Sequence, residues 1–291
     1  MSSDILTKLK EEAHGFSKGQ RLISKYISEC YDKAAFMTAS KLGKTVGVSE
    51  STVVRFAVEL GYDGYPGMQK AMQEMVLNRL TSVQRIEVAN DRLGDQDVVS
   101  LVLHSDAEKL RQTEDMLDRQ EFQRAVQAIL DAERVYILGV RSSAPLAHFL
   151  GYYLNYMSPN VHVVTTSGEG EMFEKIVAVK PEDCIIAISF PRYSSATVNA
   201  ARYCREAGSA VIGLTDSRLS PLGRNADIVL EAKSDMVSLV DSLVAPMSVI
   251  NALIVAIAAK REQRLSRIFT ALEHIWDEHH VYEKQEGSHE Q

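Results

Sequence analysis

The sequence predicts two domains: an all-α helix-turn-helix domain, followed by an α/β domain of three layers with a five-stranded parallel sheet. A chain of 291 residues is long enough for two domains of roughly 150 residues each. The first 80 residues carry apolar residues at helical spacing, and the remainder carries five short apolar runs separated by helical patterns. The expected divisions are a helix-turn-helix domain over 1–80, a helical connector over 81–120, the sheet domain over 121–262, and a C-terminal helix and tail over 263–291.

Charge is distributed unevenly along the chain. The net charge is -7, and 45% of the residues are hydrophobic, which is enough to form a core in each domain. Residues 1–80 hold 11 Lys and Arg against 9 Asp and Glu, so the acidic excess lies entirely in the later residues. A mildly basic N-terminal region is compatible with local nucleic-acid binding, although this charge alone is weak evidence.

The cysteines and the apolar segments bear on location and cofactors. Cys30, Cys184 and Cys204 are odd in number and lack metal-ligand spacing, so we expect no disulfide framework, no metal site and no cofactor, and a reducing cytoplasm. The charged N-terminus does not resemble a signal peptide.

The longest apolar segment, 243–259, is shorter than the roughly 20 residues of a membrane span. It predicts a buried or subunit-facing helix, and no membrane partner is expected.

Three helices with cap residues are predicted in the N-terminal domain. Ser17 begins a capping box at a first helix, over about residues 18–32. Thr38 caps a second helix that stops at Gly47, and Ser49 caps a third that ends at Gly61. A short Gly-containing turn between two helices is typical of the helix-turn-helix motif.

The third helix offers a polar face to a partner. With Val53 and Phe56 inward, steps of 100° per residue place Ser51 and Arg55 outward, together with Val58 and Glu59, and put Thr52 at the flank. Hydroxyls and one Arg near the start of a second helix suit reading of the DNA major groove.

Three lysines nearby, Lys41, Lys44 and Lys70, are candidates for contacts to phosphates, which position a protein on DNA without reading its sequence. The alternative is a plain three-helix bundle whose outer face is only solvated.

The N-terminal motif resembles that of the RpiR-type bacterial regulators. The segments that carry the resemblance are Thr38 to Gly47, Ser49-Glu-Ser-Thr-Val-Val-Arg-Phe56 and Leu60-Gly-Tyr-Asp-Gly-Tyr65. The resemblance implies that this domain binds a double-stranded DNA operator through Ser51, Thr52, Arg55, Lys41 and Lys44.

Helices are expected on both sides of a polar break near residues 80–97. Met68, Met72 and Met75 continue a helical stripe before the break. After it, helices are expected over about 98–117 and 121–132.

The stretch from Arg134 to Ala144 joins a strand to a helix. Tyr136, Ile137 and Leu138 predict a strand buried on both faces, and Pro145 suits the first turn of the helix that follows. Unpaired N–H groups of that first turn, with the hydroxyls of Ser142 and Ser143, would bind a phosphate. The alternative is that these serines only cap the helix.

Four more apolar runs predict the remaining strands, at 161–164, 184–188, 210–214 and 228–230. Ligands of such sheets lie at the carboxyl ends of strands, near a topological switch point. The candidate turns are 139–143, 165–171 and 189–195. Gly168-Glu-Gly170 lacks the third glycine of a dinucleotide fingerprint.

These turns resemble the sugar isomerase (SIS) domain, the phosphosugar-binding fold of RpiR-type regulators. The family's first loop is Gly-x-Gly-x-Ser, and Gly139-Val-Arg-Ser-Ser143 has Arg141 at the second glycine. The family's second loop is Ser-x-Ser-Gly-x-Thr, and Ser189-Phe-Pro-Arg-Tyr-Ser194 has Pro191 and Arg192 in place of two usual residues. Proline removes a backbone donor, whereas arginine adds an anion-binding group.

The resemblance implies an anionic, sugar-phosphate-like effector. The candidate effector-binding residues are Arg141, Ser142, Ser143, Ser189, Arg192 and Ser194. For Arg141 and Arg192, a surface or subunit ion pair is the alternative. SIS domains resemble obligate dimers, so a homodimer or homotetramer is expected, with part of an apolar helix over 239–260 at the subunit contact.

The leading hypothesis is a transcriptional regulator of sugar or sugar-phosphate metabolism genes, not an enzyme. The alternative is a sugar-phosphate isomerase or lyase that uses Glu169 or Glu171, with His148 as a further candidate for proton transfer. The carboxylates also suit a helix N-terminus, and His148 lies within a periodic helix. A scaffold without either activity is a third possibility.

The C-terminal tail is rich in His and Glu, with His279, His280, His289 and Glu290. It is expected to be solvated rather than metal-binding.

Overall fold

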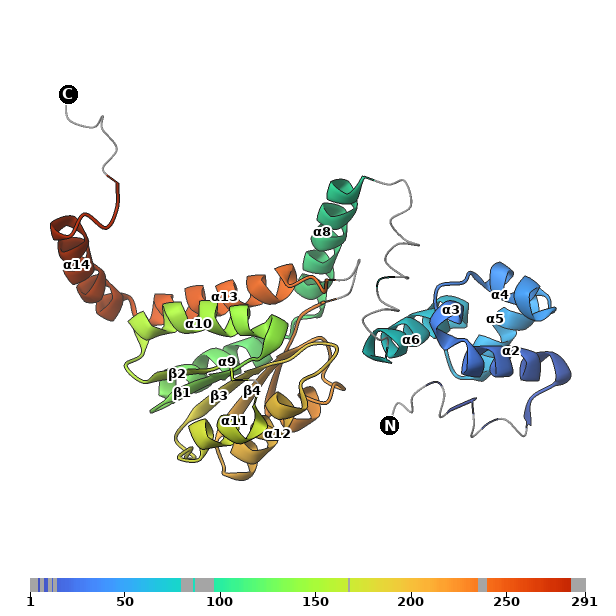
Figure 1. Ribbon diagram of the computed structural model, residues 1–291, viewed down its shortest axis with the longest axis horizontal. Coiled ribbons are helices and arrows are strands. Elements are labelled where there is room, and N and C mark those ends of the chain that lie inside the picture. The colour runs from blue at the N-terminus through green and yellow to red at the C-terminus, as the bar shows by residue number, and fades with distance from the viewer. Residues whose placement is uncertain are drawn as a thin grey trace, which may run out of the picture. The chain divides into compact units, whose positions relative to one another are not determined.

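The computed structural model describes residues 5, 8–9, 12, 15–79, 86, 97–166, 168–234 and 240–283, without the side chains of 74 and 77–79. The chain divides into two compact units (Figure 1). The first comprises residues 1–95 with 238–240, and the second comprises 96–237 with 241–291. Apart from residues 86 and 97, the expected polar break at 80–97 lies outside the described residues.

The first unit is helical. Its principal helices are α2 (Lys18–Glu29), α3 (Tyr31–Ala34), α4 (Ala39–Val46), α5 (Glu50–Glu59) and α6 (Gly64–Arg79). The predicted caps are confirmed, because the side chains of Ser17, Thr38 and Ser49 each accept a hydrogen bond from a backbone N–H three residues later. The prediction of one helix over 18–32 is wrong: Cys30 has ψ 43°, outside the helical range, and separates α2 from α3.

The core of this unit lies between the helices. Ile23 and Ile27 of α2, Leu42 of α4, Phe56 of α5 and Met68 of α6 are fully buried. Because each comes from the apolar stripe of its helix, the pattern in the sequence translates directly into packing.

The second unit is a three-layer α/β domain. Its sheet consists of β1 (Val135–Leu138), β2 (Val161–Val164), β3 (Cys184–Ile188), β4 (Ala210–Thr215) and β5 (Ile228–Glu231). The strands are parallel throughout, in the order β2-β1-β3-β4-β5. Its helices are α8 (Val98–Met116), α9 (Arg119–Asp131), η2 (Arg141–Ser143), α10 (Ala144–Met157), α11 (Glu169–Ile176), α12 (Ser195–Glu206), η3 (Gly223–Asn225), α13 (Val244–Lys260) and α14 (Glu262–Glu278). The predicted fold and all five strands are confirmed.

Alternate residues of the central strands enter two different cores. Val135 and Ile137 of β1 join one core with α9, α10 and α13, whereas Tyr136 and Leu138 join the other with α11 and α12. Figure 1 shows α10 and α13 on one side of the sheet and α11 and α12 on the opposite side. Gly151 lets α10 approach β2, because a Cβ at this position would lie 2.3 Å from Val163 Cγ2.

The last two helices differ in burial. Along α13, residues such as Val249, Leu253 and Ile257 are buried, and Val255 on the other side is 67% exposed. None of the 17 residues of α14, all of them described, is buried. Among the described residues no single helix has the length and hydropathy of a membrane span, although α13 and α14 together meet that test as a pair bent by 96°.

Candidate DNA-reading helix and effector site

The turn between α4 and α5 is built around two glycines. Gly47 has φ 78° and ends α4 in the left-handed conformation that glycine adopts without steric cost. Gly43 lies against the same turn, where a Cβ would come 2.8 Å from the carbonyl oxygen of Val48. Val48 N–H donates to the Gly43 carbonyl at 2.8 Å, so the turn closes on the helix before it. Gly43 was not singled out in the sequence, because its role depends on this close approach.

The start of α5 carries a small cluster of hydroxyls. The Ser49 hydroxyl oxygen accepts from Thr52 N–H at 3.2 Å and lies 2.9 Å from the Ser51 hydroxyl and 2.8 Å from the Thr52 hydroxyl. Ser51 is exposed and Thr52 is half-buried. A positive helix N-terminus with polar side chains is suited to a partner that carries acceptor groups.

The cationic side chains predicted to meet DNA lie at the surface. Arg55 is exposed, and its Nε donates to the Ser51 carbonyl at 3.3 Å, one turn earlier on α5. Lys41, Lys44 and Lys70 are exposed as well. The predicted face of α5 therefore points away from the core formed by Val53 and Phe56.

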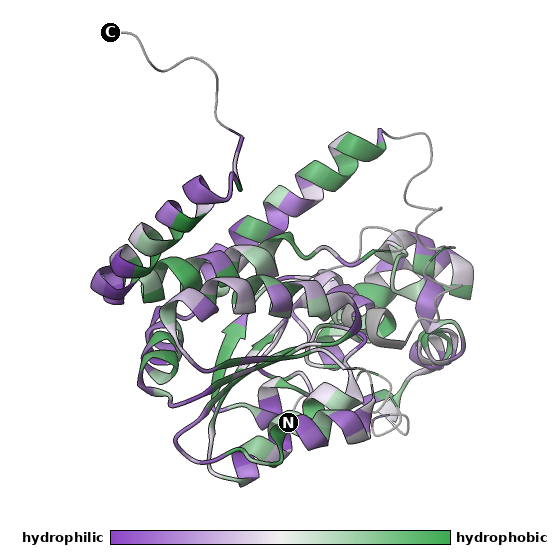
Figure 2. Cartoon of the chain, turned by 60° about the vertical axis from the view of Figure 1, so that its left-hand side comes forward, coloured by the Kyte–Doolittle hydropathy of each residue, from purple (hydrophilic) through white to green (hydrophobic). Residues whose placement is uncertain are grey.

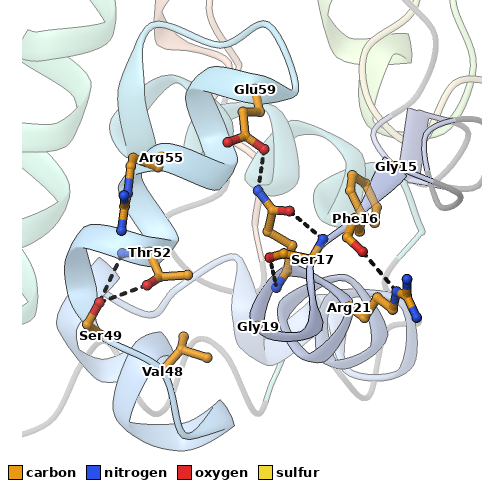
Figure 3. Close-up of a pocket in the computed structure, with 11 residues that line it drawn as sticks. Gly15, Phe16, Ser17, Gly19, Arg21, Val48, Ser49, Thr52, Arg55 and Glu59 are labelled. Atoms are coloured by element: carbon orange, nitrogen blue, oxygen red, sulfur yellow. Dashed lines mark hydrogen bonds between the residues drawn. The ribbon is translucent and has the colours of Figure 1, made fainter.

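A groove runs along one side of this face (Figure 3). It has a volume of 810 Å³ and lies between the start of α2 and α5, and Thr52 and Arg55 line it. Arg21 of α2 lines the same groove and donates from Nε to the Phe16 carbonyl at 2.9 Å. The sequence analysis missed Arg21, because it precedes the motif and only the fold brings it near α5.

The second unit has a switch point between β1 and β3. These strands are neighbours in the sheet, but β1 leads to α10 on one face and β3 leads to α12 on the other. The two loops diverge at the carboxyl ends of the strands, which is where ligands bind in open parallel sheets. Two of the three candidate turns, 139–143 and 189–195, flank this point.

The loop after β1 has an unusual backbone. Arg141 has φ 56°, a left-handed conformation that disfavours side chains with a Cβ, and it is exposed. A short 3-10 turn, η2, follows, in which Ser143 N–H donates to the Val140 carbonyl and Ala144 N–H to the Arg141 carbonyl. Two of the backbone N–H groups that were predicted to bind an anion therefore already have partners. Fewer backbone donors remain for a phosphate in this turn.

Ser143 of this loop does not cap α10 with its side chain. Ser143 precedes α10 in helical conformation and makes no side-chain cap hydrogen bond. Ser142 is exposed, and Ser143 is 5% exposed. The alternative, that these serines only cap the helix, is contradicted for Ser143.

The loop after β3 is held by its own serines. The Ser189 hydroxyl oxygen accepts from Ser194 N–H at 3.1 Å, and the Ser194 hydroxyl oxygen accepts from Thr197 N–H at 3.3 Å and caps α12. Each hydroxyl hydrogen remains able to donate to an anion. The Thr197 hydroxyl in this first turn is buried without a hydrogen-bond partner among the described residues. Arg192, at the tip of the loop, is exposed.

A tyrosine ties this loop to the next strand. Tyr193 Oη donates to the Asp216 carboxylate, at 2.8 Å to Oδ1 and 3.0 Å to Oδ2, just beyond the end of β4. Burial raises the pKa of Asp216, and the hydrogen bond from Tyr193 partly opposes that rise. The sequence analysis missed this pair, because its members are 23 positions apart.

The candidates for proton transfer have structural partners. Glu169 Oε1 accepts from Asn199 Nδ2 at 2.7 Å, which joins α11 to α12. Glu171 Oε2 accepts from the Thr166 hydroxyl, and His148 Nε2 lies 3.2 Å from Thr165 Oγ1. Glu171 and His148 therefore contact the turn after β2, and Glu169 links two helices.

Comparisons with known proteins agree with the two units. Residues 3–78 match the model of the helix-turn-helix domain of the rpiR family, and residues 128–256 match the SIS domain model. The crystal structure of an RpiR transcription factor from Sphaerobacter thermophilus (sugar isomerase domain) is similar, with 32% identity and a TM-score of 0.59. It covers 62% of this chain and 99% of that one.

Two further relatives span almost the whole chain. The Vibrio vulnificus NanR protein, in complex with ManNAc-6P, has 20% identity and a TM-score of 0.57, over 93% of this chain and 98% of that one. An HTH-type transcriptional regulator of Caldanaerobacter subterraneus is 24% identical over 89% of this chain and 92% of its own length.

Proposed function

Because the chain belongs to the RpiR family of transcriptional regulators, we propose that a sugar-phosphate-like anion, bound by its SIS domain, controls how tightly its helix-turn-helix domain binds an operator. The regulated genes are those of sugar or sugar-phosphate metabolism. The regulator acts in the cytoplasm, as a homodimer or homotetramer. Its partners are double-stranded DNA and a small anionic sugar derivative.

One observation carries the DNA-binding part of the proposal. Ser51 and Arg55 lie exposed on a helix whose opposite face, Val53 and Phe56, is completely buried. The same helix follows a tight turn and begins with a hydroxyl cluster. A second helix with these properties enters the major groove, where Arg pairs bidentately with guanine and hydroxyls contact bases or phosphates.

The effector part rests on the strand ends of the second unit. Ser142 and Ser143 flank the switch point from the β1 side, and Ser189 and Ser194 flank it from the β3 side. Four hydroxyl donors around one point suit the oxygens of a phosphate. Arg141 and Arg192 supply positive charge near positions where the family has small residues. ManNAc-6P, the ligand in the NanR complex, is a sugar phosphate of this kind.

An effector changes operator affinity only if it binds two states of the protein differently. Coupling energies of this kind are typically about 1 to 3 kcal/mol, which corresponds to roughly 5- to 150-fold in affinity.

In the enzyme alternative, Glu169 or Glu171 would transfer a proton to or from the substrate. Glu169 accepts a hydrogen bond from Asn199 of α12, and Glu171 accepts one from Thr166 in the turn after β2, so both have a structural role without catalysis.

The test of the DNA-reading face compares Arg55→Ala with Lys44→Ala. A duplex selected by the wild-type protein from a random pool serves as the operator, and affinities are measured at several salt concentrations. Arg55→Ala should lose about 1 to 3 kcal/mol on the selected duplex and little on random duplex. Lys44→Ala, the control, should weaken both equally and flatten the salt dependence. An equal loss on both duplexes for Arg55→Ala would make Arg55 a phosphate contact.

The enzyme alternative has its own test. Common sugar phosphates are incubated with the wild-type protein, with Glu169→Gln and with Glu171→Gln. The proposal expects no turnover by any of the three. Turnover by the wild type that disappears in either variant would replace the regulator hypothesis with the enzyme alternative.

A further inference from the structure

The helix α14 has an apolar seam that its own chain covers only in part. Leu265, at one end of the seam, packs against the core of the unit. Leu265, Ile268, Leu272 and Ile275 repeat at spacings of three, four and three residues, the pattern of a helix that packs along another helix. The first three are half-buried and Ile275 is 48% exposed. In Figure 2, hydrophobic and hydrophilic segments alternate along α14, the helix that leads to the C-terminus. Such a seam is stable in water when another surface covers it.

The aromatic residues beside the seam are already engaged within the chain. Phe269 packs against Tyr156 of α10, with ring centroids 5.3 Å apart, and Trp276 packs against Tyr282 at the same separation. The first contact joins α14 to α10, and the second joins α14 to the residues that follow it. The helix is therefore anchored to its unit before any partner arrives.

The charges of α14 run against its own helix dipole. Arg264 and Arg267 lie in its first half, and Glu273 and Glu278 lie in its second half, although the dipole favours acidic residues at the start and basic residues at the end. Apart from Glu262, the first turn carries no acid, and the last turn carries no basic residue. This arrangement costs the isolated helix a little stability, which indicates that the charges serve a contact outside it.

A second α14 running in the opposite direction satisfies the seam and the charges together. Reversal of the helix about its middle, near Thr270, sets Leu265 opposite Ile275 and Ile268 opposite Leu272. The same reversal sets Arg264 opposite Trp276 and places Glu278 two residues further on, roughly 3 Å along the helix axis. In a two-fold symmetric pair each of these contacts occurs twice, because residue i meets residue j and j meets i.

The hollow at the start of α14 fits the same arrangement. It has a volume of 730 Å³, at the corner between α13 and α14, and its charged lining includes Lys260, Arg264 and Arg267 against Glu262. A reversed second helix would bring its acidic end, with Glu278, to this cationic corner. A partner of unrelated sequence would have to supply both the apolar seam and the acidic end, and α14 itself has both.

We propose that α14 is a self-association surface, on which α14 of a second copy packs antiparallel, with the Leu265, Ile268, Leu272 and Ile275 seams in contact and Arg264 within two residues of the position facing Glu278 of the other copy. This inference deepens the assembly part of the proposed function by naming the surface that holds two copies together. It leaves the DNA-reading helix and the effector site unaffected, because neither lies on α14.

The first test adds a charge to each side of the same helix in the full-length protein. Ile275→Glu places a charge in the seam, whereas Thr270→Glu, the control, places the same charge at an exposed position off the seam. Sedimentation velocity over a range of concentrations measures the mass of each assembly. Ile275→Glu should halve the mass of the wild-type assembly, or raise its dissociation constant at least tenfold, and Thr270→Glu should change neither. Equal behaviour of the two variants would overturn the proposal.

The second test does not depend on the apolar core of the seam. Arg264→Glu places an acidic residue near Glu278 of the other copy, twice per pair, and should weaken association roughly fivefold to tenfold. Arg264→Glu combined with Glu278→Arg should restore the wild-type value within about threefold. Failure of the double variant to restore association would refute the antiparallel register. If the wild-type protein is monomeric at all concentrations, both this inference and the proposed oligomer are refuted. If the wild-type protein is an oligomer and none of these variants changes its association, only the α14 surface is refuted.

Discussion

Two helices of this protein begin with serines, and the serines serve different purposes. At the start of α5, Ser49 caps the helix, since its hydroxyl oxygen accepts from Thr52 N–H at 3.2 Å. At the start of α10, Ser143 makes no side-chain cap, because a 3-10 turn precedes the helix and already satisfies backbone donors there. A serine at a helix start therefore caps the helix in one place and makes no cap hydrogen bond in another.

A third helix start lies between these two cases. Ser194 caps α12 and also lies on the β3 side of the switch point. Its oxygen is used by the helix, so only its hydroxyl hydrogen is left for a ligand. We therefore expect Ser143 and Ser189 to contribute more to effector binding than Ser194 does.

The largest expected effect would come from removing two hydroxyls of the proposed effector site. Ser143→Ala combined with Ser189→Ala should abolish the ligand response, since each lost hydrogen bond to a charged group costs about 1.5 to 3 kcal/mol. Effector affinity should fall well over tenfold, while operator binding without effector persists. The measurement is operator affinity across sugar phosphates and their unphosphorylated sugars. An unchanged response would place the effector elsewhere, and a response to uncharged sugars alone would refute the phosphate assignment.

A smaller effect is expected at the cap of α5. Ser49→Ala should lower the free energy of local opening at α5 by about 1 kcal/mol, because Thr52 N–H loses its acceptor. Ser143→Ala is the matched control and should change the opening of α10 by less than about 0.5 kcal/mol. Hydrogen exchange of the amides in both helices of the intact protein measures the two values. Equal losses at α5 and α10 would remove the distinction between the two helix starts.

The smallest expected effect concerns Arg141. Its φ of 56° favours glycine, so Arg141→Gly should raise the free energy of unfolding of the second unit by about 0.5 to 1 kcal/mol. If Arg141 contacts the effector, the same change should weaken the effector response. Chemical denaturation, followed with an effector titration, separates the two results. A gain in stability with an unchanged response would leave Arg141 a surface or subunit role.

The sequence determined what depends on neighbours along the chain. The caps at Ser17, Thr38 and Ser49, the left-handed end at Gly47 and the five buried strands follow from local spacing and from the chemistry of single residues. The outward face of α5 was also predictable, because helix geometry fixes which residues lie opposite Val53. These features need only interactions within about one helical turn or one strand.

Tertiary structure decided what depends on residues far apart in the sequence. The switch point exists because the sheet places β3 beside β1, and the tie from Tyr193 to Asp216 and the approach of Arg21 to α5 arise only in the folded chain. The same holds for the 3-10 turn that takes up backbone donors before α10, and for the part of the α14 seam that the chain leaves exposed. A sequence pattern shows which side chains are apolar, charged or able to form hydrogen bonds. Folding decides which of these side chains already have partners within the chain. Those left without a partner are available to a ligand, to DNA or to a second copy.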